Sequence, residues 1–434
     1  MINYKSFSSR RAITCASLLV PALALVFCYP LCLAQPPSTP EEAEKLWNSI
    51  PKVQMQGGLK AYWNVTAVDP IKKVHDRQAR EHGFGVVTLK MSYSDYPGKQ
   101  KQNIYRFLET NSKNPWDRPK YFERIVKQNI LAPNPPENLL VHDIEFKFEH
   151  DAEVAERDAA IRASSGVSQE GAFQPAYYKA WAQWFADPCR WAKEIYPEIP
   201  IGIYGIQPFS RDYFGVRNKT SEQIDERHKN ELLIWKNIDP VVDYYTSSVY
   251  FFDEQPDSIY YMAANIEENY YRTRTFGNKP LYAYVMLRFH PGTKEKKEVE
   301  DYQTEASAVI PYFTGAKGIV FYHSLRSAPF PTGLPLFMKS LGRVARISEA
   351  LGKAQLMKDE PVSEVWRKKT PLIRRMKVTE TEWYVLLANP WQGEGDSKMV
   401  SVQCGGHTVP LSVKGKHTEI YHITQGTATR IEME

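Results

Sequence analysis

The sequence predicts an α/β fold: a (β/α) barrel like a TIM barrel, with seven or eight strands, and a C-terminal antiparallel β-sandwich. Short apolar segments alternate with amphipathic helical segments through most of the chain, which is typical of a parallel sheet covered by helices. No glycine-rich phosphate loop accompanies the alternation, which favours a closed barrel over an open sheet. From about residue 355, short strand patterns follow one another without helices, which indicates the sandwich.

The elements follow one another in order along the chain. The expected barrel strands are 59–66, 85–92, 139–146, 199–207, 243–251, 280–287 and 317–323. The expected helices between them are 70–81, 118–128, 175–196, 221–236, 258–275, 298–313 and 334–351. The expected tail strands are 362–366, 372–378, 383–388, 398–404, 407–413, 419–423 and 427–432.

The N-terminal segment differs from the rest of the chain. Lys5, Arg10 and Arg11 precede an uncharged apolar stretch that ends at Ala34. This pattern predicts a signal peptide over 1–34, followed by a linker with a short helix over 35–52, the barrel over 53–354 and the sandwich over 355–434. We therefore expect a secreted, periplasmic or extracellular protein without a membrane span in the mature chain. An uncleaved N-terminal anchor is the alternative, because the stretch is long enough to span a bilayer.

Charge and cysteine content exclude several classes of function. The 434 residues carry a formal net charge of +5, and removal of the three basic leader residues leaves about +2, which does not favour nucleic acid as a partner. Only Cys189 and Cys404 follow the leader, and two isolated thiols are expected. No zinc-type spacing occurs. We expect no metal, no organic cofactor and a monomer.

Two acids close one of the expected strands. Asp143 and Glu145 end the run Leu-Leu-Val-His-Asp-Ile-Glu, so they share one face while Ile144 points the opposite way. Barrels place their chemistry at the C-terminal ends of strands, and two close carboxyls favour retention of a proton by one of them. Such a pair suits cleavage of a glycosidic bond. The alternative is a structural pair neutralised by a base such as Lys90 or Lys147.

Aromatic and basic side chains near other strand ends are candidate substrate-binding residues. Aromatic rings stack on sugar rings, and a basic residue could hold an acidic sugar. The aromatic candidates are Tyr62, Trp63, Tyr204, Tyr250 and Tyr322, and the basic candidate is Arg288. Any one of these aromatic residues alone is more often a core residue, and the basic residue could equally be a solvated loop charge.

Several of these segments resemble, in order, motifs of the animal and venom hyaluronidase family. The resemblance covers about residues 59–351. The matching segments are Tyr-Trp-Asn-Val-Thr at 62–66, Met-Ser-Tyr-Ser-Asp-Tyr-Pro-Gly at 91–98, Val-His-Asp-Ile-Glu at 141–145, Ile-Gly-Ile-Tyr at 201–204, Ser-Val-Tyr at 248–250 and Gly-Ala-Lys-Gly-Ile-Val-Phe-Tyr at 315–322. The family has a distorted seven-stranded barrel.

The resemblance implies roles for the matching residues. Glu145 would be the general acid, and Asp143 would orient the substrate's N-acetyl group, which itself attacks the anomeric carbon. Tyr204 and Tyr250 would lie close to that group, and Tyr322 would hold a floor position where the family has Trp. The expected function is therefore hyaluronidase-like hydrolysis of a polysaccharide or glycosaminoglycan-like substrate that contains N-acetylhexosamine.

Two alternative functions remain open. A retaining glycosidase or another endo-hexosaminidase would need a second carboxylate at about 5 Å, on another strand. Segment 281–287 contains no acid, which favours assistance by the substrate, whereas Asp253 and Glu254 are the rival nucleophiles. The alternative of another class is a glycan-binding barrel in which the same aromatic residues hold sugar without cleaving it.

Overall fold

The structure, a computed structural model, describes residues 39–67, 69–91, 93, 103–111, 113–131, 135–145, 151–204, 220–290, 297–325 and 330–434. The described residues belong to one compact unit, Pro37–Glu434. The expected signal peptide over 1–34 lies outside them, as do most of the motif at 91–98 and Lys147.

Seven parallel strands form a nearly closed barrel, which confirms the expected fold class. The strands are β1 (Lys60–Thr66), β2 (Gly85–Lys90), β3 (Leu139–Asp143), β4 (Ile201–Tyr204), β5 (Tyr245–Ser248), β6 (Leu281–Val285) and β7 (Gly318–Ser324). They are hydrogen-bonded in the order β4-β3-β2-β1-β7-β6-β5. Between β4 and β5, the Asp243 amide and the Thr246 hydroxyl donate hydrogen bonds to the Ile201 and Ile203 carbonyls, at 2.7 and 2.6 Å.

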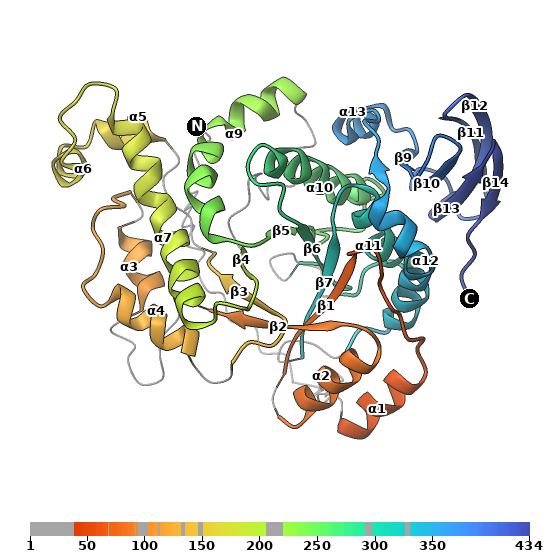
Figure 1. Ribbon diagram of the computed structural model, residues 1–434, viewed down its shortest axis with the longest axis horizontal. Helices are drawn as coiled ribbons and strands as arrows, with labels where there is room; N and C mark the ends of the chain where they lie inside the picture. Colours follow the sequence, from red (N-terminus) through yellow and green to blue (C-terminus); the bar gives the residue numbers. More distant parts are fainter. Residues whose placement is uncertain are drawn as a thin grey trace, which may run out of the picture. The chain divides into compact units, whose positions relative to one another are not determined.

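Helices surround this sheet (Figure 1). In the barrel region they are α1 (Pro40–Asn48), α2 (Ile71–Glu81), α3 (Ile104–Thr110), α4 (Phe122–Leu131), α5 (Ala152–Glu156), α6 (Ala159–Ser165), α7 (Phe173–Ile195), α9 (Ser221–Ile238), α10 (Ser258–Arg274), α11 (Asp301–Phe313) and α12 (Leu334–Lys353), with a 3₁₀ turn at Asp239–Val241. Each expected barrel helix is present, with ends shifted by a few residues.

The two faces of the strands form separate cores. Side chains that point into the barrel form a cluster rich in tyrosine, with members on all seven strands or in the residues that flank them. Side chains that point outward join the larger core beneath the helices, which includes Trp63 and Phe321. The alternation of strand side chains therefore gives the barrel a polar-tipped aromatic interior and an apolar exterior.

The C-terminal region consists of two antiparallel sheets and one helix. Its elements are β8 (Gln355–Leu356), α13 (Val362–Lys368), β9 (Leu372–Lys377), β10 (Glu382–Ala388), β11 (Ser397–Cys404), β12 (His407–Lys414), β13 (Thr418–Thr424) and β14 (Thr427–Arg430). The first sheet has the order β14-β13-β10-β9-β8, and the second pairs β11 with β12. Side chains of both sheets share one core, as expected for a sandwich.

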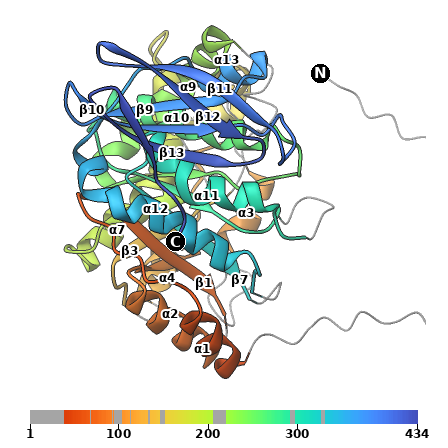
Figure 2. The same ribbon diagram turned by 90° about the vertical axis from the view of Figure 1, so that its right-hand side faces the viewer.

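Helix α11 lies between the barrel and the C-terminal strands (Figure 2). Every residue from Tyr302 to Phe313 is buried, which is the pattern of a helix enclosed on all sides. Its one buried carboxylate, Glu305, accepts hydrogen bonds from the Thr418 amide and the His417 ring, both at 3.3 Å. The tail therefore packs closely on the barrel.

The short helix expected within 35–52 is α1, for which Thr39 and Glu42 form a capping box and whose Trp47 is fully buried against Trp63. One expectation for local structure is wrong. The segment 362–366 is not a strand but lies in α13, whose buried Val362, Val365 and Trp366 have the spacing of one helix face.

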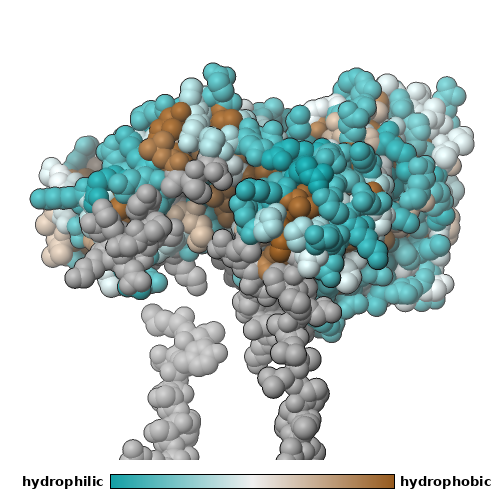
Figure 3. Space-filling model, turned by 90° about the horizontal axis from the view of Figure 1, so that it is seen from below, coloured by the Kyte–Doolittle hydropathy of each residue, from teal (hydrophilic) through white to brown (hydrophobic). Residues whose placement is uncertain are grey.

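The thiols and the surface agree with an ordinary globular chain. Cys189 and Cys404 are both buried and free, as expected. The surface in Figure 3 is mostly hydrophilic, with hydrophobic residues in separate patches. Among the residues that the structure describes, the exposed large hydrophobic side chains lie on different elements: they are Met91, Leu131, Val154, Tyr271 and Met399. No helix in the described ranges has the length and hydrophobicity needed to cross a bilayer.

Candidate active site

The two acids lie together at the C-terminal end of β3. Asp143 is the last residue of the strand and is partly exposed, Ile144 is fully buried, and Glu145 is exposed. The Ile144 amide donates a 3.0 Å hydrogen bond to the Tyr204 carbonyl, which continues the pairing with β4 beyond the strand. Asp143 and Glu145 therefore share a face at the mouth of the barrel.

A tyrosine from α3 holds the backbone between the two acids. The Tyr105 hydroxyl donates a 3.1 Å hydrogen bond to the Asp143 carbonyl and accepts one of 3.2 Å from the Glu145 amide. Burial raises the pKa of Tyr105 well above its usual value, and the negative charges of Asp143 and Glu145 add to the effect. The phenol therefore stays protonated and fixes the turn that carries both carboxyls.

Four tyrosines form an aromatic arc beside the acids: three lie on β4, β6 and β7, and Tyr250 follows β5 by two residues. Tyr204 packs against Tyr284 and Tyr250, with ring centroids 4.8 and 6.2 Å apart. Tyr250 stacks on Tyr322 at 6.0 Å, with the planes 25° apart. Hydrogen bonds fix the arc, because the Tyr204 hydroxyl lies 2.8 Å from the Ser248 hydroxyl.

Asn64 extends this polar lining to β1. Its Nδ2 donates a 3.4 Å hydrogen bond to the Tyr284 hydroxyl. The side chain is buried, at the position two residues before the end of the strand. Polar tips from β1 and from β3 to β7 therefore converge on one end of the barrel.

Both acids act electrostatically on the same tyrosine, Tyr322. Burial raises the pKa of Tyr322, and the charge of Asp143 and the weaker effect of Glu145 raise it further, while a hydrogen bond with Thr66 opposes them. Burial also raises the pKa of Tyr284, to which the Asp143 charge contributes. These phenols remain neutral donors beside the two carboxyls.

The alternative partner Lys90 lies on the other side of the sheet. It pairs in register with His142, one residue before Asp143, and is buried. Its positive charge, together with burial, lowers the pKa of His142. By the alternation of strand side chains, Lys90 and His142 face away from the barrel interior into which Asp143 points.

Two of the expected substrate-binding residues lie elsewhere. Trp63 is fully buried on the outer face of β1, where its ring stacks on Phe321 at 4.8 Å, so this expectation is wrong. Tyr62 faces the interior, but in a deeper layer, where it packs against Tyr282 with centroids 5.1 Å apart. Neighbouring residues of a strand face opposite sides, so Tyr62 and Trp63 could not both line one site.

The remaining candidates lie around the edge of the site. Arg288 follows β6 and forms an isolated antiparallel β-bridge with Glu298 through the backbone. Its guanidinium lies 3.9 Å from the Glu298 carboxylate. The His290 ring lies 6.1 Å from that of Tyr250. The rival acid Glu254 is exposed and ion-paired with Lys297, whose charge lowers its pKa, and the Asp253 carboxylate accepts a 3.0 Å hydrogen bond from the Gln255 amide.

Sequence reasoning missed Tyr105, Tyr284 and Asn64. Tyr284 follows from the same alternation as Tyr204 and Tyr322, since its strand was recognised and its neighbour Tyr282 also faces inward. Asn64 lies within the motif at 62–66. Tyr105 had no signal, because nothing in the sequence distinguishes it among 26 tyrosines. Among the described residues, no three His, Cys, Asp or Glu side chains gather as metal ligands.

Comparisons with known proteins find a structural resemblance but no matching sequence family. No family model and no curated protein matches the chain. The crystal structure of bee venom hyaluronidase matches with a TM-score of 0.45 and 13% identity, over 68% of this chain and 98% of that one. α-L-Fucosidase isoenzyme 2 from Paenibacillus thiaminolyticus matches with a TM-score of 0.42 and 10% identity, over 74% and 47%. The β-galactosidase from Rahnella sp. R3 gives 0.40 and 13%, over 70% and 52%. The chain is thus distantly similar in structure to several glycoside hydrolases.

Proposed function

We propose that this protein is an exported glycoside hydrolase that cleaves a polysaccharide containing N-acetylhexosamine. The observation that carries the proposal is the placement of two acids on one face, at the C-terminal end of β3, beside the tyrosine arc. Barrel enzymes carry their catalytic groups at this end. The aromatic arc with polar tips suits a sugar ring, which needs both stacking faces and hydroxyl partners.

In this mechanism each acid has its own role. Glu145 is exposed and protonates the leaving glycosidic oxygen, while the substrate's acetamide oxygen attacks the anomeric carbon. Asp143 is less exposed and orients the acetamide and stabilises its developing positive charge. Water then opens the cyclic intermediate and returns a proton to Glu145. Neither β6 nor the paired Glu254 offers a second free-standing carboxylate, which favours this route over a protein nucleophile.

The test is release of reducing ends from a panel of polysaccharides, with hyaluronan, chondroitin and chitin oligosaccharides and their N-deacetylated forms. We expect Glu145→Gln to lower kcat by a factor of about 10³ or more, and Asp143→Asn to lower it comparably on acetylated substrates. Glu254→Gln is the matched control and should keep full activity.

Each alternative gives a different result. Unchanged cleavage by Glu145→Gln contradicts the acid assignment, and loss of cleavage in Glu254→Gln favours the rival nucleophile. Equal cleavage of deacetylated substrates contradicts the role of the acetamide. Binding of sugars without cleavage by the wild type indicates a glycan-binding barrel. Export is tested separately, by N-terminal sequencing of the protein recovered outside the cytoplasm.

A further inference from the structure

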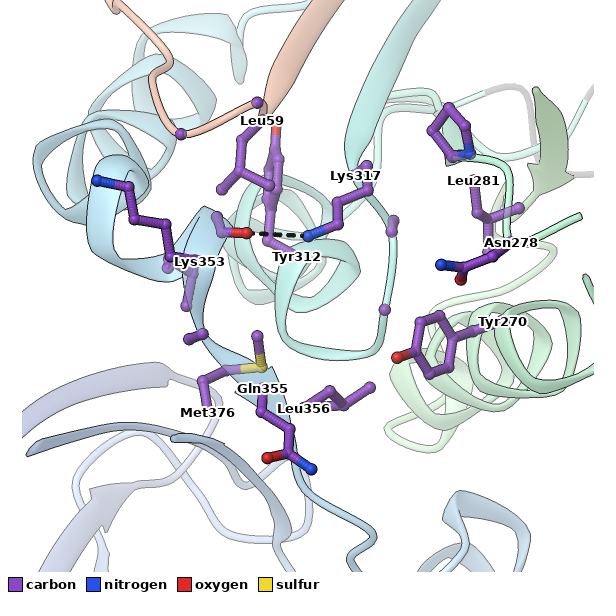
Figure 4. A pocket seen from close by; sticks show the side chains of 18 of the residues that line it. Leu59, Tyr270, Asn278, Leu281, Tyr312, Lys317, Lys353, Gln355, Leu356 and Met376 are labelled. Atoms are coloured by element: carbon purple, nitrogen blue, oxygen red, sulfur yellow. Dashed lines mark hydrogen bonds between the residues drawn. The ribbon is translucent and has the colours of Figure 1, made fainter. Parts of the chain in front are cut away.

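A cavity of about 590 Å³ opens at the end of the barrel opposite the acids. Leu59, Leu281 and Lys317 line it, and they lie at the starts of β1, β6 and β7. The C-terminal ends of α10 and α12 form further walls, and β8 and β9 close it with Leu356 and Met376. The cavity therefore lies where the barrel meets the C-terminal sheet (Figure 4).

The charges around this cavity are of one sign. Its described lining includes Arg274, Lys279, Lys317 and Lys353 but no Asp or Glu. Lys279 is ion-paired with Asp239 at 3.3 Å, and Lys353 with Glu349 at 2.8 Å. In the described part of the chain, no carboxylate pairs with Lys317 or Arg274.

These two cations are held in place by uncharged groups. The Lys317 ammonium donates a 3.1 Å hydrogen bond to the Gly352 carbonyl at the end of α12, across the cavity in Figure 4. The Arg274 guanidinium donates a 2.7 Å hydrogen bond to the Tyr270 hydroxyl. Lys317 and Arg274 line the same cavity. Burial lowers the pKa of Lys317, and repulsion from Arg274 lowers it further.

Glycines allow the walls of the cavity to approach closely. A Cβ on Gly352 would lie 2.0 Å from the Gly57 carbonyl oxygen, and one on Gly315 would lie 2.4 Å from the Tyr270 ring. Gly315 also has a φ of +113°, which side chains rarely adopt. The close approach of the Gly315 backbone thus helps to fix the Tyr270 ring, whose hydroxyl is the hydrogen-bond partner of Arg274.

We propose that this cavity binds a small organic acid, of the size of a sugar phosphate or a sugar acid, with its oxyanion between Lys317 and Arg274. Lys317 and Arg274 each donate a hydrogen bond to an uncharged group, and neither has a carboxylate partner in the described part of the chain. They therefore favour an anion, which would gain charge-assisted hydrogen bonds from both. The cavity volume lies within the range of small-molecule sites. The site is independent of the proposed hydrolysis, because it lies at the other end of the barrel.

Calorimetric titration of the full chain with inorganic phosphate, glucose 6-phosphate, glucuronate and uncharged glucose tests the site. We expect saturable binding of at least one organic anion, weakened by added salt, and no binding of glucose. The phosphate and carboxylate probes show which oxyanion is preferred. Lys317→Met and Arg274→Gln should each weaken binding about tenfold or more.

Lys339→Gln is the matched control, because Lys339 is an exposed lysine of α12 that is not among the residues lining the cavity. It removes a charge from the helix whose Gly352 carbonyl binds Lys317 and should leave affinity unchanged within about twofold. Equal weakening by Lys339→Gln would indicate only general surface charge and overturn the proposal, as would the absence of binding of every anion up to about 10 mM. If Lys317→Met fails to fold, Arg274→Gln alone decides, since its side chain hydrogen-bonds only to Tyr270 in the described part.

Discussion

The Tyr105 hydroxyl ties the backbone positions of both acids together. It hydrogen-bonds to backbone atoms of the two acids, the Asp143 carbonyl and the Glu145 amide. These two contacts do not involve the carboxylates. In the proposed mechanism Tyr105 is therefore a positioning residue. A shift of about 1 Å in the general acid is enough to lower the rate strongly, so this contact should matter for rate more than for binding.

Tyr105→Phe should lower kcat about 10- to 100-fold with little change in KM, because the ring stays and only the two backbone contacts are lost. The free energy of unfolding should fall by about 1 kcal/mol. Steady-state kinetics across pH, together with denaturant titration, measures both effects.

The control is Tyr421→Phe, which removes a 2.6 Å hydrogen bond to the Ser412 carbonyl in the C-terminal strands. It should lower stability by a similar amount without changing kcat. Equal activity of wild type and Tyr105→Phe would show that the turn holds its shape without the hydroxyl.

At this scale, the sequence was informative where a residue's position follows from alternation. Asp143 and Tyr204 are the last residues of recognised strands, and Tyr322 lies two residues before the end of another, each at an inward position of the alternation. The same rule, applied to neighbouring residues, would have separated Tyr62 from Trp63. Tyr105 could not be found, because its place beneath the acids depends on how α3 packs, which a single sequence does not encode locally.

At the scale of elements, one buried ion pair joins α10 to the C-terminal sheet. Glu267 of α10 accepts hydrogen bonds from the Arg374 guanidinium of β9 and from the Val362 amide at the start of α13, at 2.9 and 2.8 Å. The side chains are only 2% (Arg374) and 11% (Glu267) exposed. Burial raises the pKa of Glu267, although the Arg374 charge opposes it.

Arg374→Met should lower the free energy of unfolding by about 3–5 kcal/mol, because it leaves the Glu267 carboxylate buried without its cation. The double variant Glu267→Gln with Arg374→Met should recover part of that loss, since the amide oxygen can still accept from Val362. Denaturant titration of both variants measures this. The exposed ion pair of Lys353 with Glu349 offers a control. Lys353→Met should lower the free energy of unfolding by less than about 1 kcal/mol. No recovery in the double variant would contradict the explanation by an isolated charge.

The same region shows where patterns at the element scale mislead. The segment 362–366 reads Val-Ser-Glu-Val-Trp, whose β-branched and aromatic residues are typical of strands. Its apolar positions nevertheless have the spacing of one helix face, and Pro361 precedes the helix at its N-cap. In so short a segment residue type and periodicity can favour different elements. The long, strongly periodic barrel elements were recognised because their length separates the periods.

At the scale of the whole molecule, two buried histidines make stability depend on pH. Burial, together with repulsion from His323, lowers the pKa of His75 to about 4. Burial, together with the positive charge of Lys90, lowers the pKa of His142 to about 3. The unfolded chain binds these protons near the ordinary value of 6.5. Below that pH the unfolded state therefore takes up more protons than the folded state, so stability is full above about 6.5 and falls as the pH decreases.

Buried carboxyls act in the opposite direction at lower pH. Burial raises the pKa of Glu267 and Glu305, so the folded state binds their protons more readily than the unfolded chain does. The net curve is therefore a sum of opposing contributions, and a histidine's share is best isolated by comparing the wild type with a variant that lacks only that group.

His142→Gln isolates one of these contributions. Between pH 7.5 and pH 5 the wild type should lose about 2 kcal/mol more of its free energy of unfolding than the variant, because each unit of pKa shift corresponds to about 1.4 kcal/mol. Denaturant titration at both pH values measures the difference. The exposed His407→Gln is the control for the loss of a histidine side chain as such. A gap between the wild type and His142→Gln that does not change with pH would show that His142 takes up its proton as readily in the folded chain as in the unfolded one.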